Sequence, residues 1–173
     1  IESEYEIYKS IIGDEYNLVV GVRGIANQRN FISNYFELDT YICSLDDDIE
    51  KIMFLDDDID LTSVNNLKLI ISFMINTMDS AEVNLCGVYP IANAFYMRDN
   101  VTTDLRFCIG GFYIFKNKKL MLSTSAESKE DIENTIKYFI HDSAVLRFNN
   151  LTFKSKKHAC GGLGKDRDMM NAY

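Results

Sequence analysis

The chain alternates between short apolar runs and longer stretches in which apolar residues recur every three or four positions. Mostly apolar runs such as Tyr16–Val22 (YNLVVGV) are typical of buried strands, whereas the helical spacing in Ser63–Met78 predicts an amphipathic helix. The predicted helices are Tyr5–Ile12, Ile25–Tyr35, Ser63–Met78 and Lys129–Ile140, and the predicted strands are Tyr16–Val22, Tyr41–Leu45, Val83–Val88 and Leu105–Phe115, with a hairpin at Val145–Phe148 and Leu151–Lys154. Alternating strands and helices predict an α/β sandwich with a mostly parallel sheet, and the later strands indicate mixed pairing.

Length and composition predict one domain with a substantial core, because the 173 residues are 47% hydrophobic and contain a single proline. The longest apolar run, Leu69–Ile75, is too short to span a bilayer. The four cysteines are irregularly spaced, which argues against a structural zinc site and favours a reducing compartment. We therefore expect a cytoplasmic protein, and for a viral protein the host cytoplasm.

The net charge of −8 works against non-specific binding to nucleic acid, yet the charge is unevenly distributed. Base is concentrated near the end of the chain, where it could form a local basic face for a polyanion. The residues concerned are Arg147, Lys154, Lys156 and Lys157.

Candidate chemistry is concentrated where the predicted strand Tyr41–Leu45 runs directly into Asp46, Asp47 and Asp48. Carboxylates fixed at a strand end repel one another unless a cation lies between them, and Mg²⁺ and Mn²⁺ prefer such oxygen ligands. On an extended segment, Asp46 and Asp48 would face the same side. The alternative is a polar loop that caps the next element. The string LDDDI recurs at Leu55–Ile59, which we interpret as a solvated acidic turn of a hairpin.

The order of motifs resembles that of nucleotide-sugar glycosyltransferases of the GT-A fold. The matching features are an Asp triplet after a strand, a glycine pair in a later strand, a Glu-Asp pair opening a helix, and a histidine near the end; here they are Asp46–Asp48, Gly110–Gly111, Glu130–Asp131 and His158. The segment Gly21–Asn30 is similar to the helix that lies near the donor nucleotide in that family. The resemblance implies a GT-A-like, Rossmann-like domain over residues 1–173, with a mixed, mostly parallel sheet flanked by helices.

The resemblance also implies roles for individual residues. Asp46, Asp48 and His158 would bind Mn²⁺ or Mg²⁺, and Asp131 would be the general base, with Glu130 as the alternative base or an acceptor ligand. The donor, a nucleotide-diphosphate sugar and most simply a UDP-sugar, would be held by Arg23, Gly24, Arg29, Asn30, Asp46, Asp47, Gly110 and Gly111. Structural alternatives remain: a helix start favours Glu130 and Asp131 through its dipole, and the glycine pair is also typical of a β-bulge.

The narrower likeness is to glycosyltransferases associated with DNA base hypermodification in phages and large viruses, through Lys129–Glu133, Val145–Asn149 and Gly161–Gly162. It implies an inverting transfer of a hexose to a hydroxyl, with a hydroxymethylated DNA base as one acceptor and a glycan or protein as the other. Two further classes stay open: a two-metal nucleotidyltransferase or nuclease, and a non-catalytic acidic module that binds cations. The family's first strand, which holds the nucleotide base, has no counterpart before Tyr5–Ile12, so we expect it to be missing or supplied elsewhere.

Overall fold

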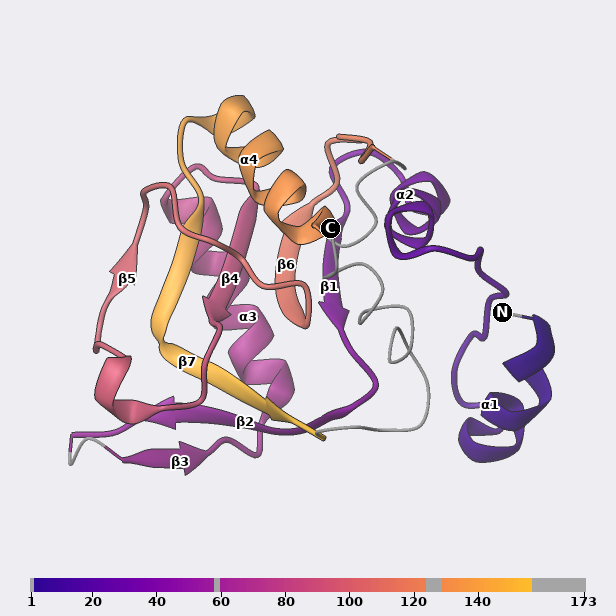
Figure 1. Cartoon of the computed structure of the whole chain (residues 1–173), viewed down its shortest axis with the longest axis horizontal. Coiled ribbons are helices and arrows are strands. Elements are labelled where there is room, and N and C mark those ends of the chain that lie inside the picture. The colour runs from indigo at the N-terminus through magenta and orange to yellow at the C-terminus, as the bar shows by residue number, and fades with distance from the viewer. Residues whose placement is uncertain (1, 58–59, 124–128, 157–173) are drawn as a thin grey trace, which may run out of the picture.

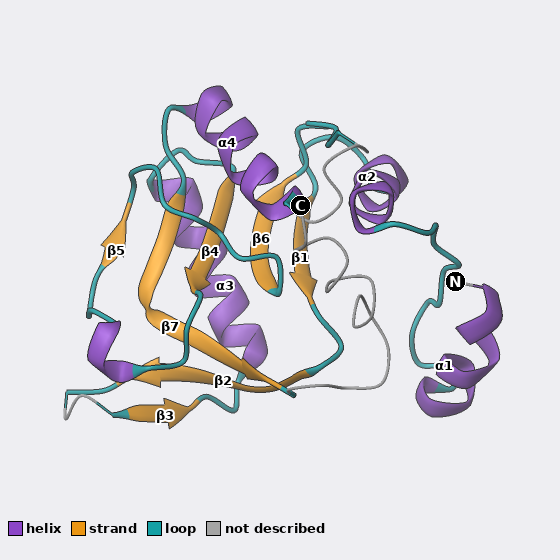
Figure 2. Cartoon of the chain, viewed as in Figure 1, coloured by secondary structure: helices purple, strands orange, loops and turns teal. Residues whose placement is uncertain are grey.

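The computed structural model describes residues 2–57, 60–123 and 129–156 (Figures 1 and 2). Its helices are η1 (Glu2–Glu4), α1 (Tyr5–Ile12), α2 (Ile25–Tyr35), α3 (Leu67–Ser80), η2 (Ala94–Tyr96) and α4 (Glu130–Asp142). Its strands are β1 (Tyr41–Leu45), β2 (Ile49–Leu55), β3 (Leu61–Ser63), β4 (Leu85–Tyr89), β5 (Val101–Thr102), β6 (Phe112–Lys116) and β7 (Leu146–Ser155). The predicted mixture of helices and strands is therefore confirmed, and β1, α1 and α2 have the predicted bounds.

The strands form one curled sheet in the order β1-β6-β4-β7-β2-β3, with β5 beside β7. Only β4 and β7 run parallel; every other described pairing is antiparallel. The prediction of a mostly parallel sheet was therefore wrong. Parallel neighbours need a crossover connection, usually a helix, but β2 reaches its neighbour β3 through a short turn. The helices instead join strands that are not parallel neighbours.

β7 links the two halves of the sheet. Its first half pairs in parallel with β4, and its second half pairs antiparallel with β2, so the strand turns from the upright strands toward the crossing pair β2 and β3 (Figure 1). The predicted hairpin at Val145–Phe148 and Leu151–Lys154 was wrong, because Asn149 and Asn150 continue the strand instead of turning. Their amides are used by neighbouring loops: Asn149 Nδ2 donates to Asn100 Oδ1 and Asn150 Nδ2 donates to Asp99 Oδ1.

Two hydrophobic clusters lie on opposite faces of the sheet, because alternate residues of a strand point to opposite sides. On one face, α3 buries Met74 and Met78 against Phe112 and Phe148. On the other face, Tyr138 of α4 packs with residues of β1, β4 and β6; the buried members of that cluster are Ile42, Leu85, Cys108, Tyr113, Phe115, Tyr138 and Val145. Cys86 and Cys108 are buried free thiols in these clusters, while Cys43 is half-buried.

The segment before α2 departs most from the sequence prediction. Tyr16–Val22 forms no strand and pairs with no strand of the described chain, and Val19, Val20 and Val22 are each more than 40% exposed. Helix α1 has no buried residue and lies apart from the sheet (Figure 1). The apolar sequence of Tyr16–Val22 favours a strand. A strand, however, needs a neighbouring backbone with which to form hydrogen bonds, and no described strand pairs with this segment. The prediction of a buried strand at Tyr16–Val22 was wrong.

No helix in the described ranges has both the length and the hydrophobicity needed to cross a membrane.

Candidate functional site

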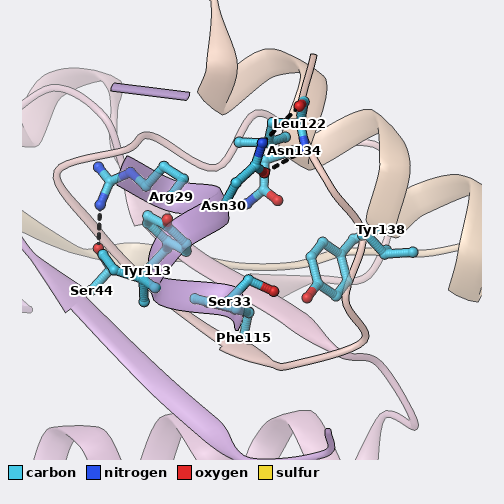
Figure 3. A pocket seen from close by; sticks show the side chains of 11 residues that line it. Arg29, Asn30, Ser33, Ser44, Tyr113, Phe115, Leu122, Asn134 and Tyr138 are labelled. Carbon is cyan, nitrogen blue, oxygen red and sulfur yellow. Dashed lines mark hydrogen bonds between the residues drawn. The ribbon is translucent and has the colours of Figure 1, made fainter. Parts of the chain in front are cut away.

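Arg29 of α2 connects Ser44, near the end of β1 (Figure 3), to Gly110 in the segment that precedes β6. Its Nη1 donates a hydrogen bond to Ser44 Oγ at 2.6 Å, and its Nη2 donates to the carbonyl oxygen of Gly110 at 2.9 Å. Nη2 also lies 3.6 Å from Asp46 Oδ1, and the guanidinium stands 5.3 Å from the centre of the Tyr113 ring. The Arg29 side chain is only 14% exposed, so these contacts fix its position. The candidate site is built around this residue.

The first Asp triplet forms a tight turn between β1 and β2. The Ile49 amide donates to the Asp46 carbonyl oxygen at 3.4 Å, so Asp46–Ile49 is not extended, and the predicted alternation of Asp46 and Asp48 does not apply. Burial raises the pKa of Asp46, Arg29 opposes this shift, and the charges of Asp48 and Asp47 add to it. Half of the Asp46 carboxylate still faces solvent, at 48% exposure. The turn therefore gathers negative charge that Arg29 only partly balances.

Asp47 and Asp48 are held in different ways. Asp47 accepts a hydrogen bond from the Tyr8 hydroxyl of α1, while the carbonyl oxygen of Asp48 accepts from the Lys156 amide at 2.9 Å. Asp47 is thus turned toward the N-terminal arm, here defined as residues 2–24, and not toward Arg29. Between Asp46 and Asp47, the carboxylate of Asp46 is the one that lies beside Arg29.

Gly110 and Gly111 bring backbone close to the acidic groups. The amide of Gly110 donates to Asp131 Oδ2 at 3.4 Å, and the carbonyl oxygen of Gly111 accepts from the Asp46 amide at 3.0 Å. A Cβ atom on Gly111 would lie 2.5 Å from Cζ of Phe153 and 3.4 Å from Asp46 Oδ2. The predicted strand Leu105–Phe115 starts only at Phe112, so the glycines precede β6 and are not a break within it.

Glu130 and Asp131 begin α4, as predicted, directly beside Gly110. Glu130 is only 7% exposed, and burial together with the neighbouring charge of Asp131 raises its pKa, while Arg29 opposes the shift. Asp131 uses Oδ2 toward the Gly110 amide and remains partly exposed. Of the pair, Glu130 is the buried carboxyl that neighbours Arg29, and Asp131 is the carboxylate that a molecule in solvent can reach.

Two small cavities adjoin Arg29. One, shown in Figure 3, has a volume of about 20 Å³ and lies between α2, β1, β6 and α4. The other measures about 10 Å³ and is lined by residues that include Gly110, Glu130 and Asp131. A buried water needs about 10–15 Å³, so each holds about one water molecule and neither encloses a nucleotide. A larger ligand would have to bind on the open surface above Asp46 and Asp131.

The carboxylates of the turn offer oxygen ligands of the kind that Mg²⁺ and Mn²⁺ prefer. Asp46 and Asp48 are close enough for their charges to interact, and a cation would relieve that repulsion. Within residues 2–57, 60–123 and 129–156, no group of three His, Cys, Asp or Glu side chains is arranged to hold a metal ion. Within those residues, Asp46 and Asp48 therefore have no third protein side chain arranged to complete a metal site. His158, the predicted third ligand, lies outside the described residues.

The other predicted donor ligands lie away from this centre or serve the fold. Arg23 is exposed, and Gly24 precedes α2 with a φ of 88°, a conformation that favours glycine. Asn30 exchanges hydrogen bonds with the backbone of Leu122, its Nδ2 donating at 2.9 Å and its Oδ1 accepting at 2.7 Å (Figure 3). Asn30 therefore anchors the loop after β6 to α2, a structural role.

The second triplet behaves as expected for a hairpin turn. The carboxylate of Asp56 accepts hydrogen bonds from the Asp60 amide at 3.1 Å and the Thr62 hydroxyl at 2.7 Å, which closes the turn between β2 and β3. Asp57 is exposed. The prediction of a hairpin turn at the second LDDDI string is confirmed for the residues described.

Sequence reasoning missed Ser44 and Tyr113, which both contact Arg29. Each had a signal: Ser44 is the hydroxyl within an otherwise apolar strand, and Tyr113 lies two residues after the glycine pair. Burial raises the pKa of Tyr113, while Arg29 and a hydrogen bond with Ser44 oppose the shift. The tyrosine is therefore a neutral support for the guanidinium.

No family model matches this chain, and neither does any curated protein or solved structure.

Proposed function

We propose that this chain is a metal-dependent glycosyltransferase domain that transfers a hexose from a nucleotide-diphosphate sugar to an acceptor hydroxyl. One observation carries the proposal: Arg29 brings Asp46, at the end of β1, next to Gly110 and the Glu130–Asp131 pair. These residues are separated by as many as 102 positions, and a purely structural acidic turn would not require them to meet. The motif order that resembles the GT-A family supports the same reading.

In the proposed reaction, the two carboxylates of the turn, Asp46 and Asp48, would hold Mn²⁺ or Mg²⁺. The bound ion would neutralise the diphosphate that leaves. Arg29 adds a fixed positive charge on the same side, although its bonds to Ser44 and Gly110 already use both terminal nitrogens. Arg29 therefore orients the site and balances Asp46, and it is a positioning residue.

Asp131 is the proposed general base. The acceptor oxygen would attack the anomeric carbon, the bond from that carbon to the diphosphate oxygen would break, and the acceptor proton would pass to Asp131. Glu130 cannot easily serve this purpose because it is buried, and its raised pKa favours a bound proton. The Gly110 amide bonded to Asp131 Oδ2 keeps that carboxylate at the mouth of the smaller cavity.

The test is a thermal-shift titration with uridine diphosphate, with and without Mn²⁺. A ligand that binds only the folded state raises Tm, so we expect a metal-dependent rise in the wild type and none in Asp48→Asn. Asp57→Asn is the matched control, because it removes the same charge from the second LDDDI string. The expected result is a Tm rise that survives in Asp57→Asn.

The proposal fails if uridine, guanosine, adenosine and cytidine diphosphates all give no metal-dependent shift. It also fails if Mn²⁺ alone produces the whole shift, since that outcome identifies a cation-binding module without a nucleotide site. Release of free hexose from UDP-glucose, lost in Asp131→Asn, would support transfer chemistry, whereas release of uridine monophosphate would identify a pyrophosphate-cleaving enzyme and overturn it.

A further inference from the structure

A pair of arginines lies on the same face of the sheet as the candidate site. Arg147 of β7 is in register with Gly87 of β4 and with Thr102 of β5. Its strand neighbours Leu146 and Phe148 belong to the cluster under α3, so Arg147 points to the opposite face. That is the face of α4, Tyr113 and the Glu130–Asp131 pair.

Arg147 is held in a fixed orientation. Its Nε donates to Asn149 Oδ1 at 2.8 Å, and Asn149 in turn donates to Asn100 Oδ1 at 2.8 Å. The guanidinium lies over the Tyr89 ring, 5.2 Å from its centre. In the described part of the chain Arg147 forms no ion pair with a carboxylate, and its two terminal nitrogens have no hydrogen-bond acceptor.

Arg106 adds a second positive charge to the same place. Its Nε donates to both oxygens of Asp104 at 2.9 Å, which leaves the terminal nitrogens available. The pKa of Arg147 is lowered first by burial and next by the charge of Arg106, while Cys108, Tyr89 and Asp104 oppose this shift. Asp104 is thus paired with Arg106, and Arg147 has no carboxylate partner among the described residues, in a chain whose net charge is −8. This excess of positive charge suits an anion.

Cys108 connects the arginine pair to the carboxylates. Its thiol lies near the carbonyl oxygens of Arg106 and Leu146, at 3.7 and 3.8 Å, and its amide donates a hydrogen bond to Thr135 Oγ1 of α4 at 3.2 Å. Cys108 also lines the small cavity that Glu130 and Asp131 line. Cys108 therefore contacts the backbone at Arg106 and next to Arg147, and it also lines the cavity beside the acidic pair.

We propose that Arg106 and Arg147 form a binding site for one phosphate group. Guanidinium forks match the geometry of phosphate oxygens, and a group held by two of them is bound with charge-assisted hydrogen bonds. The proposal of a phosphate site depends only on the two arginines and not on the proposed function. Its purpose deepens the proposed function: a phosphate bound here would place a phosphate-bearing acceptor beside Asp131. The phosphate could come from a nucleic-acid backbone or from a small phosphate ester.

The test compares three probes: inorganic phosphate, a 12-nucleotide single-stranded DNA, and uridine diphosphate with Mn²⁺. The variants are Arg147→Gln and Arg106→Gln, with Lys68→Gln as the control of equal charge change on α3. We expect each arginine variant to weaken phosphate binding roughly tenfold or more, and Lys68→Gln to leave it unchanged. For DNA, each should also reduce the slope of log affinity against log salt by about one.

The arms separate the two sources of phosphate. Weaker DNA binding assigns the site to a backbone phosphate, whereas weaker binding of inorganic phosphate alone assigns it to a small ester. Failure of this proposal and failure of the proposed function can be told apart. If Asp48→Asn loses the diphosphate-dependent Tm shift but still binds phosphate, the arginine site is separate from the donor site. A phosphate affinity within twofold of wild type in both arginine variants overturns the proposal. Arg106 is 47% exposed, so its variant folds even if Arg147→Gln does not.

Discussion

At the scale of single residues, Arg29 is the side chain on which the site depends most. One guanidinium joins three parts of the chain: α2, the end of β1, and the Gly110 loop. A buried charge of this kind needs all of its partners, because removal of one leaves an uncompensated group. Arg29 and the groups that it touches therefore form a unit whose members cannot be changed independently.

The first residue-scale prediction concerns the close packing of Gly111. Gly111→Ala would place a Cβ 2.5 Å from Phe153 Cζ and 3.0 Å from Cε2. Such overpacking costs about 1–3 kcal/mol of unfolding free energy, measurable by urea denaturation. Gly110→Ala is the control, since its Cβ would meet nothing nearer than 3.4 Å. In the double variant with Gly111→Ala, Phe153→Leu should recover part of the lost unfolding free energy. If the effects of the two changes simply add, the two residues are not in contact.

The second prediction concerns the pH dependence that Glu130 gives to stability. Its folded pKa is raised, mainly by burial, so its contribution is fully present below the ordinary carboxyl range and is lost as the pH rises through the folded pKa. Glu130→Gln keeps the shape without the charge. We expect this variant to raise the unfolding free energy near pH 7 and to change it less near pH 4. A lower unfolding free energy of the variant at pH 7 would show that the charged form is stabilised instead.

At the scale of elements, helices α3 and α1 differ in how much they contribute to the free energy of unfolding. Met74 in α3 is fully buried, so Met74→Ala removes a core side chain and should cost about 2–5 kcal/mol of unfolding free energy. Ile11 in α1 is 74% exposed, and Ile11→Ala should change stability by no more than about 0.5 kcal/mol. Urea denaturation of both variants checks the contrast. Equal costs would mean that α1 is packed against a surface.

The sequence was sufficient for those elements whose pattern reflects local geometry. Helix α2 and strand β1 have the predicted bounds, and α3 and α4 differ only at their ends. Tyr16–Val22 and the β7 segment were mispredicted, because whether an apolar run becomes a paired strand depends on which backbone lies next to it. The direction of the strands was mispredicted for the same reason: pairing is decided by contacts between distant segments.

At the scale of the whole molecule, part of the candidate site could be predicted from the sequence. The Asp triplet, the glycine pair and the Glu-Asp pair were identified as separate motifs, and the fold brings Asp46, Gly110, Gly111, Glu130 and Asp131 together around Arg29. The supporting contacts of Ser44 and Tyr113 were not predicted, because they depend on the pairing of β1 with β6. Asp47 turns toward Tyr8 because α1 lies beside the turn, which no local pattern could reveal.

The molecule also separates its charges along one face. Acid gathers at the turn after β1 and at the start of α4, and the arginines gather where β4, β5 and β7 meet. A substrate with one anionic group and one group to be modified would be oriented by this gradient before any close contact forms. Net charge alone, at −8, conceals the basic end of that face.

The position of β7 has a consequence for synthesis on the ribosome. In the sheet order β1-β6-β4-β7-β2-β3, β7 is the link between β4 and β2, yet it is the last described element of the chain. Until Ser155 has left the exit tunnel, β2 and β3 have no partner that ties them to the rest of the sheet. While β7 is still inside the ribosome, the nascent chain therefore carries apolar strands that lack their native neighbours, and the sheet is completed only after β7 emerges.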